Sequence, residues 1–116
     1  MSDYCVIGSG ISGATIANLL NKKFQVNLYD KGRGPGGRAS FKRIKGQIGF
    51  DHGTQYFSPK TIEFKKFTNR LIKIKILKKW SGNHIFLNSK KKENKKHIKI
   101  IGKKGNNDIC KFLLKK

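Results

Sequence analysis

Residues 4–13 read Y-C-V-I-G-S-G-I-S-G, a short apolar run that breaks into three glycines spaced as G-x-G-x-x-G. The run indicates a strand, and glycines followed by a helical pattern indicate a tight turn into a helix. Gly8 lets the chain leave the strand, Gly10 leaves room for a pyrophosphate against the backbone, and Gly13 allows the helix to pack closely on the strand. The helix amino end then offers N–H groups and a positive dipole end to phosphates. This pattern predicts the opening of a dinucleotide-binding fold.

A second strand is predicted at residues 25–29, where Val26 and Leu28 share one face. Asp30 follows it, 20 positions after Gly10. A carboxylate there can accept hydrogen bonds from the adenosine ribose hydroxyls, which favours a cofactor with an unmodified 2′-OH over NADP. Between the strands, helical spacing predicts a helix that packs on the sheet through three apolar residues, Ile16, Leu19 and Leu20. The alternative, an ordinary glycine turn, does not account for the strand, the helix and Asp30 together.

The length of 116 residues suffices for one small domain, whereas nucleotide-binding oxidoreductases need a full doubly wound sheet. No apolar stretch is long enough for a membrane span, and residues 1–20 lack the cationic start of a signal peptide, so a cytoplasmic location is expected. Cys5, in a strand expected to be buried, and Cys110, in an expected helix, show no C-x-x-C spacing. We interpret both as small buried thiols without a redox role.

The net charge of +21 is uneven, with about +5 on residues 1–59 and about +16 on residues 60–116. Clustered cations can bind nucleic acid by releasing counterions from phosphates. The surplus consists of 23 Lys and only 4 Arg, interleaved with Ile and Leu, whereas readers of bases rely on Arg and stacked aromatic residues. We therefore predict solvated faces with non-specific nucleic-acid binding at most. The lack of a long apolar stretch predicts no membrane partner.

Residues 31–38 read K-G-R-G-P-G-G-R, which is too rich in glycine for a helix or a strand. Gly36 and Gly37 permit close backbone approach, and the guanidinium of Arg38 can pair with a pyrophosphate. A solvated loop is the alternative. Residues 39–44 and 47–50 then predict a hairpin around Gly46, which leads into F-D-H-G-T-Q-Y-F at residues 50–57.

These three motifs, in this order and spacing, resemble the renalase-like FAD-dependent oxidoreductases, relatives of the flavin amine oxidases. The resemblance implies a Rossmann-like FAD/NAD(P)-binding fold. It also implies a small-molecule substrate, a reduced nicotinamide, NAD(P)H, or an amine, which is oxidised by hydride transfer to flavin. Trp80 and residues 100–109 also resemble the family, although Lys104 and Asn106 stand where it usually has proline and methionine. The resemblance implies cofactor contacts with the pyrophosphate, the ribose and the flavin edge at Gly8, Gly10, Ile11, Ser12, Gly13, Asp30, Lys31, Gly37, Arg38, Gln55 and Tyr56.

The expected architecture is an α/β fold, with a Rossmann-like βαβ start and an antiparallel β excursion, that is incomplete relative to the family. Residues 1–58 are expected to bind FAD, and residues 59–116 to resemble the start of a substrate domain. Because the resemblance covers only the amino-terminal third or so of a typical member, we expect this chain to be inactive alone. Three explanations of that coverage stay open: a fragment of a longer protein, a split gene with a separately encoded carboxy-terminal half, and a decayed gene. A dehydrogenase module that binds NAD and a basic nucleic-acid-associated protein are the alternatives.

The other elements are predicted to be structural. A helix capped by Ser58, with Pro59 in its first turn, carries an apolar stripe of Phe64, Phe67, Leu71 and Ile74. Strands are expected at residues 75–80, 84–88 and 97–101, and a last helix at 107–114. No catalytic base is identified. His52 is a candidate for acid–base chemistry because histidine often has that role, but a role with Asp51 in fixing their loop is favoured. Neither His84 nor His97 is assigned to a metal.

Overall fold

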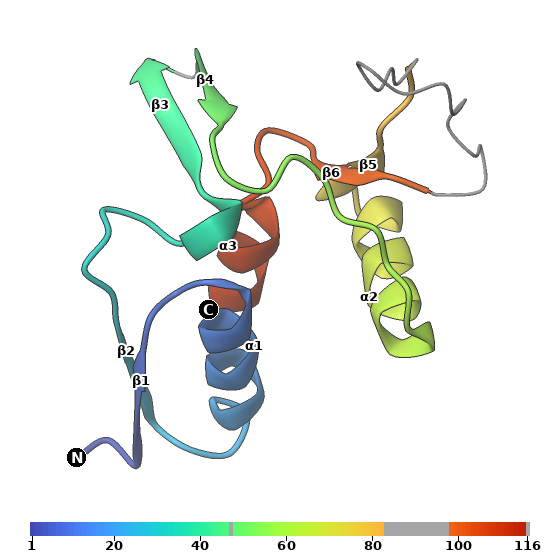
Figure 1. Ribbon diagram of the computed structural model, residues 1–116. Coiled ribbons are helices and arrows are strands. Elements are labelled where there is room, and N and C mark those ends of the chain that lie inside the picture. The colour runs from blue at the N-terminus through green and yellow to red at the C-terminus, as the bar shows by residue number, and fades with distance from the viewer. Residues whose placement is uncertain (47, 83–97, 116) are drawn as a thin grey trace.

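The computed structural model describes residues 1–46, 48–82 and 98–115 of an α/β chain (Figure 1). Its helices and strands follow one another in the order β1 (Tyr4–Ile7), α1 (Ile11–Leu20), β2 (Val26–Tyr29), the 3-10 turn η1 (Gly37–Ala39), β3 (Phe41–Lys45), β4 (Ile48–Asp51), α2 (Ile62–Lys73), β5 (Leu77–Lys79), β6 (Ile100–Gly102) and α3 (Asp108–Leu114). The strands form a parallel pair, β1 with β2, and two antiparallel pairs, β3 with β4 and β5 with β6. The predicted βαβ start and antiparallel excursion are both confirmed. No helix in the described ranges is long and apolar enough to cross a bilayer.

The βαβ unit has the predicted strands but a different buried helix face. Val26 and Leu28 are half-buried, as the alternation predicted. Helix α1, however, buries Ala14 and Ala17, while Ile16 and Leu19 are 45% and 53% exposed. Leu20 is half-buried. The prediction that Ile16 and Leu19 lie on the buried face was wrong. The small side chains of Ala14 and Ala17 allow α1 to approach its neighbours closely, and the larger ones lie on other faces of the helix.

The two cysteines lie in opposite environments. Cys110 is fully buried in α3, and this burial raises the pKa of its thiol to about 11. Cys5 is exposed, so its predicted burial was wrong. Side chains alternate along a strand, and a parallel strand is buried on both faces only where each face is covered by another layer. Helix α1 covers the face of Val6, and the face of Ile7, which is 86% exposed, is uncovered within the described ranges.

The β3–β4 hairpin follows the second glycine-rich segment. Phe41 pairs with Asp51, and Gly46 takes a φ of +56° in the turn; residue 47 lies outside the described ranges. The predicted hairpin is thus confirmed, with β3 starting two residues later. The segment predicted to be only a loop contains η1, in which the Ala39 N–H donates to the Gly36 carbonyl at 2.9 Å.

Helix α2 starts three residues later than predicted. Its cap is Thr61, whose hydroxyl oxygen accepts from the Phe64 N–H at 3.2 Å. The prediction of Ser58 as cap was wrong because the chain is still extended there: Phe57 exchanges two backbone hydrogen bonds with Ile100, at 2.7 and 2.9 Å. The apolar stripe is present in part, since Leu71 is fully buried, Phe64 and Phe67 are half-buried, and Ile74 is exposed.

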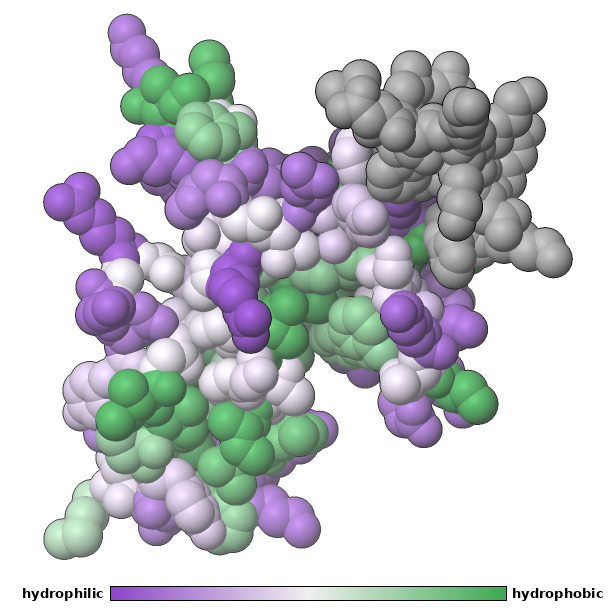
Figure 2. Space-filling view, in the orientation of Figure 1, coloured by the Kyte–Doolittle hydropathy of each residue, from purple (hydrophilic) through white to green (hydrophobic). Residues whose placement is uncertain are grey.

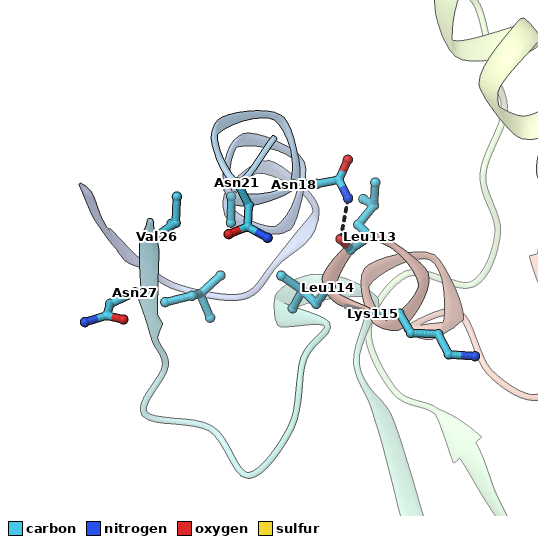
Figure 3. A pocket seen from close by; sticks show the side chains of 9 residues that line it. Asn18, Asn21, Val26, Asn27, Leu113, Leu114 and Lys115 are labelled. Atoms are coloured by element: carbon cyan, nitrogen blue, oxygen red, sulfur yellow. Dashed lines mark hydrogen bonds between the residues drawn. The ribbon is translucent and has the colours of Figure 1, made fainter. Parts of the chain in front are cut away.

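Helix α3 lies at the centre of the molecule (Figure 1). Its buried residues form the core together with residues of α1, η1, α2, β5 and β6. The Asn18 amide on α1 donates to the Leu113 carbonyl at 2.7 Å, beside a cavity of about 350 Å³ that lies between α1, β2 and the last turn of α3 (Figure 3). The predicted last helix is confirmed. The predicted strand at 84–88 lies outside the described residues, as do His84 and His97. The core residues are Ala14, Ala39, Phe57, Leu71, Leu77, Ile100, Ile109, Cys110 and Leu113.

Candidate functional site

The first glycine motif forms an open helix amino end. Gly8 has a φ of +96°, which favours glycine, and its N–H donates to the Tyr29 carbonyl at 2.7 Å, so the turn leaves β1 beside the end of β2. Gly10 is the N-cap residue of α1, and because glycine has no side chain, it leaves the N–H groups of the first turn without a side-chain acceptor. The first helical bond runs from the Ala14 N–H to the Gly10 carbonyl at 2.8 Å. The N–H groups of the first turn therefore point out of the helix end, where an anion can accept from them.

The second glycine motif packs directly against the first. The Gly36 N–H donates to the Ser9 carbonyl at 3.0 Å, and Gly10 and Gly36 form an isolated parallel bridge. A Cβ on Gly37 would lie 3.0 Å from the Gly10 Cα, closer than nearly all real side chains tolerate. We call this meeting point of Gly8–Gly10 with Gly36–Gly37 the glycine junction. It brings together two motifs that are 26 residues apart in the sequence.

Asp30 fixes the glycine junction to the end of β2. Its Oδ2 accepts from the Ser9 N–H at 2.5 Å and from the Ser9 hydroxyl at 2.7 Å, and its Oδ1 accepts from the Gly32 N–H at 2.6 Å. The Ser9 hydroxyl and then the Gly32 N–H hold the pKa of this carboxyl at about 2. Asp30 is therefore an anion at neutral pH, and its Oδ1 keeps a second acceptor position for a ligand hydroxyl.

We expect the Asp30 hydrogen bonds to make stability depend on pH. The pKa of the carboxyl falls from an ordinary 3.8 to about 2 on folding, so its stabilising effect is complete above 3.8 and is lost as the pH falls through 2. An Asp30→Asn variant should show a flatter decline of the free energy of unfolding between about pH 4 and pH 2 than the unmodified chain. Urea unfolding of both proteins across this range measures the difference. If the free energies of unfolding of the two proteins fell in parallel with pH, the hydrogen bonds from Ser9 and Gly32 would not favour the ionised form of Asp30.

The other predicted site residues follow the glycine junction along the chain. Ser12 and Lys31 are exposed next to it, and Ile11 begins α1. Arg38 is exposed in η1, and its carbonyl accepts from the Thr54 N–H at 2.7 Å, which places the segment with Gln55 and Tyr56 beside it. Gln55 is exposed. The ring of Tyr56 is half-buried, 5.8 Å from the ring of Trp80 and 4.7 Å from the Lys99 ammonium.

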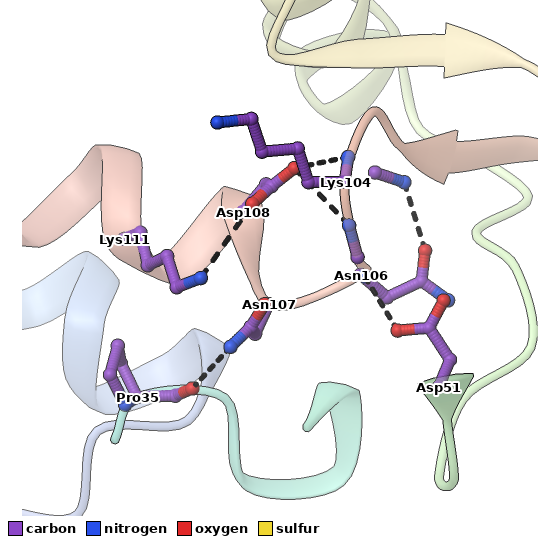
Figure 4. Close-up of polar contacts among 9 residues, drawn as sticks. Pro35, Asp51, Lys104, Asn106, Asn107, Asp108 and Lys111 are labelled. Atoms are coloured by element: carbon purple, nitrogen blue, oxygen red, sulfur yellow. Dashed lines mark hydrogen bonds and ion pairs between the residues drawn. The ribbon is translucent and has the colours of Figure 1, made fainter. Parts of the chain in front are cut away.

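Asn106 joins several segments by hydrogen bonds, a role that was not predicted from the sequence (Figure 4). It is fully buried, and its Nδ2 donates to the carbonyls of Thr54 at 2.6 Å and Gln55 at 3.0 Å. Its Oδ1 accepts from the Gly102 N–H at 2.9 Å, and its own N–H donates to Asp51 Oδ1 at 2.7 Å. The sequence signal that could have identified Asn106 is its difference from the renalase-like family that the sequence resembles, which usually has methionine at this position. Asn106 thus holds the segment that carries Gln55 and Tyr56.

His52 and Asp51 fix their loop through different partners. The His52 ring nitrogen Nε2 lies 3.2 Å from the Ser40 hydroxyl, and its ring packs edge-on against Phe50. Asp51 accepts from the backbone N–H of Asn106. These contacts support the loop-fixing interpretation over an acid–base role for His52. Among the described residues, no three His, Cys, Asp or Glu side chains gather where they could hold a metal ion.

A family model described as an NAD(P)-binding Rossmann-like domain matches residues 6–71. The match spans both halves of the glycine junction, Asp30, the β3–β4 hairpin and most of α2. The chain belongs to this family. Membership indicates binding of a dinucleotide cofactor and supports a dinucleotide-binding oxidoreductase module. In this Rossmann-like domain, the glycine junction lies where the fold places a pyrophosphate, at the amino end of the helix after the first strand.

Proposed function

We propose that this Rossmann-like chain is the cofactor-binding part of an FAD-dependent oxidoreductase of the renalase and amine-oxidase type, which oxidises a reduced nicotinamide or an amine. The observation that carries the proposal is the glycine junction, where an open helix end, two backbone segments and the Asp30 carboxylate meet. FAD, when bound, would supply the hydride chemistry. The residues of this chain would hold and orient it.

The role of each residue follows from its chemistry. The first-turn N–H groups of α1 and the Arg38 guanidinium suit a pyrophosphate, because both are donors and Arg38 is a cation. Asp30 can only accept hydrogen bonds at neutral pH, so it suits a ribose hydroxyl and repels a 2′-phosphate. These contacts recognise the ADP half that FAD and NAD share.

NAD is the second candidate cofactor. The matched family and the Asp30 carboxylate are as compatible with NAD as with FAD. FAD is favoured by the second glycine motif and by the segment at residues 50–57, which the resemblance assigns to flavin binding. Asn106 holds that segment through two hydrogen bonds, and the Thr54 N–H bonds it to the Arg38 carbonyl. A segment that positions a flavin ring needs such support.

Calorimetric titration of the 116-residue chain with ADP, FAD, NAD and NADP tests the proposal. We expect ADP and FAD to bind in the micromolar range or more weakly, because the contacts above lie mainly on the ADP half and one face of the β1–β2 pair is uncovered within the described ranges. NADP should bind at least about tenfold more weakly than NAD, because Asp30 repels its extra phosphate.

Asp30→Asn should lower ADP affinity by roughly tenfold to a hundredfold, the loss expected for a charge-assisted hydrogen bond. The matched control is Asp3→Asn, which removes a carboxylate that accepts from the Gln25 N–H at the far end of β1 and should leave ADP affinity unchanged. Thermal unfolding of both variants shows whether they fold. Equal affinity for NAD and NADP, or no affinity for ADP, would overturn the assignment of this site.

A further inference from the structure

A second surface of the chain has the form of a groove between helices. It has a volume of about 670 Å³ and lies between α1 and α2, with α3 as its floor. Figure 2 shows the molecule indented between the part that carries α1 and the part that carries α2. We call this surface the helix groove, and its apolar lining is Ile11, Leu19, Phe64, Phe67, Phe112 and Leu113.

The α1 wall of the helix groove lacks the charges that cover the rest of the chain. Residues 4–21 contain no charged side chain, although 28% of all residues are charged. Leu19 lies in the groove and is 53% exposed, and the half-buried Phe64 and Phe67 face it from α2. An uncharged helix beside exposed apolar side chains is typical of a surface that another molecule covers.

Cations dominate the rim of this groove. Lys22 follows the end of α1, Lys115 follows α3, and the Arg70 guanidinium lies 5.8 Å from the centre of the Phe112 ring. Glu63 is the one acidic residue that lines the groove among the described residues. With a net charge of +21 on the whole chain, the groove combines an apolar floor with a positive rim.

We propose that the helix groove binds an amphipathic helix of a partner polypeptide, with an apolar face and acidic flanks. A groove between two helices floored by a third suits a helix whose anchors recur at i, i+3, i+4 and i+7. The positive rim selects acidic flanks, because complementary charge favours the correct partner and repels others. This proposal is independent of the cofactor assignment.

A second copy of this chain fits the helix groove poorly. Helix α1 has no charged residue, and α2 has one acidic residue, Glu63, against four basic ones. Helix α3 has one acidic residue, Asp108, and one basic residue, Lys111. None of these three helices offers acidic flanks, so a second copy of any of them would not match the positive rim.

The test uses fluorescent synthetic peptides and the full chain. One peptide of about 18 residues, or five turns, has leucine at the anchor positions and glutamate elsewhere. A second has lysine in place of glutamate, and a third has the acidic composition in scrambled order. Fluorescence anisotropy should show binding of the acidic amphipathic peptide at least about tenfold tighter than that of either other peptide. Equal binding of the scrambled acidic peptide would overturn the proposal.

Two matched pairs of variants localise the binding. The double variant Lys22→Glu, Lys115→Glu should bind the acidic peptide at least about tenfold more weakly than the unmodified chain. The double variant Lys42→Glu, Lys45→Glu makes the same charge change on β3 and should lose less than about twofold in affinity. Leu19→Asn should weaken binding about tenfold, and Ile16→Asn, a similarly exposed residue of α1 outside the groove lining, should not. Equal effects within either pair would overturn the proposal. A competition experiment with equimolar dodecanoate would also overturn it if the peptide were fully displaced, because the occupant would then be a lipid anion.

Discussion

Gly10→Ala is expected to leave the chain folded and to remove most of its affinity for ADP and FAD, whereas Gly13→Ala is expected to destabilise the fold. The two glycines belong to the same motif but meet different surroundings. Gly10 has a φ of −68°, which any residue adopts, and an added Cβ would lie 3.7 Å from the Gly37 Cα, an ordinary contact. An added Cβ on Gly13 would overlap the Gly8 carbonyl oxygen, which is backbone and cannot move aside cheaply.

The expected magnitudes separate the two roles. Gly10→Ala should change the free energy of unfolding by less than about 1 kcal/mol, because its conformation suits alanine. Its methyl group would occupy the space where a pyrophosphate approaches, so ADP affinity should fall at least about tenfold. Gly13→Ala should cost about 1–3 kcal/mol through overpacking. Urea unfolding and calorimetric titration measure both quantities. Full ADP affinity in Gly10→Ala would show that the phosphate lies elsewhere.

Local sequence pattern was sufficient to predict the βαβ start. The positions of β1 and β2, the turn at Gly8 and the last helix depend on residue periodicity and on glycine, which act over a few residues. The proximity of the two glycine motifs was also implied by the fold, because the chain leaves β2 at the same edge at which it leaves β1.

Features set by distant contacts could not be predicted in this way. Thr61 caps α2 in place of Ser58 because Phe57 pairs with Ile100, a partner 43 positions away. The exposure of Cys5 depends on which face of β1 is covered. The contact between Ser9 and Asp30 required the strand register, in which Ile7 lies opposite Tyr29. With that register known, a small polar residue between the two glycines would have been recognised as the partner of Asp30.

Asn106 joins the fold to the site, because its side chain holds the backbone that carries Gln55 and Tyr56. The same amide accepts from the Gly102 N–H, so it ties this segment to the end of β6. A buried amide of this kind stabilises only while all its partners are present, and each partner left unsatisfied costs about 1–3 kcal/mol. The methionine that the renalase-like family usually has at this position could not replace these hydrogen bonds.

Asn106→Met is therefore expected to lower the free energy of unfolding by about 3 kcal/mol or more, although methionine has a similar size, because the Gly102 N–H and two carbonyls lose their partner. Asn107→Ala is the matched control. Among the described residues, its Nδ2 donates only to the Pro35 carbonyl, at 3.3 Å, and its buried Oδ1 has no partner. The loss of this side chain should therefore cost less than about 1 kcal/mol. Urea unfolding measures both. Similar costs for the two variants would mean that Asn106 fills space and does not hold the segment through its hydrogen bonds.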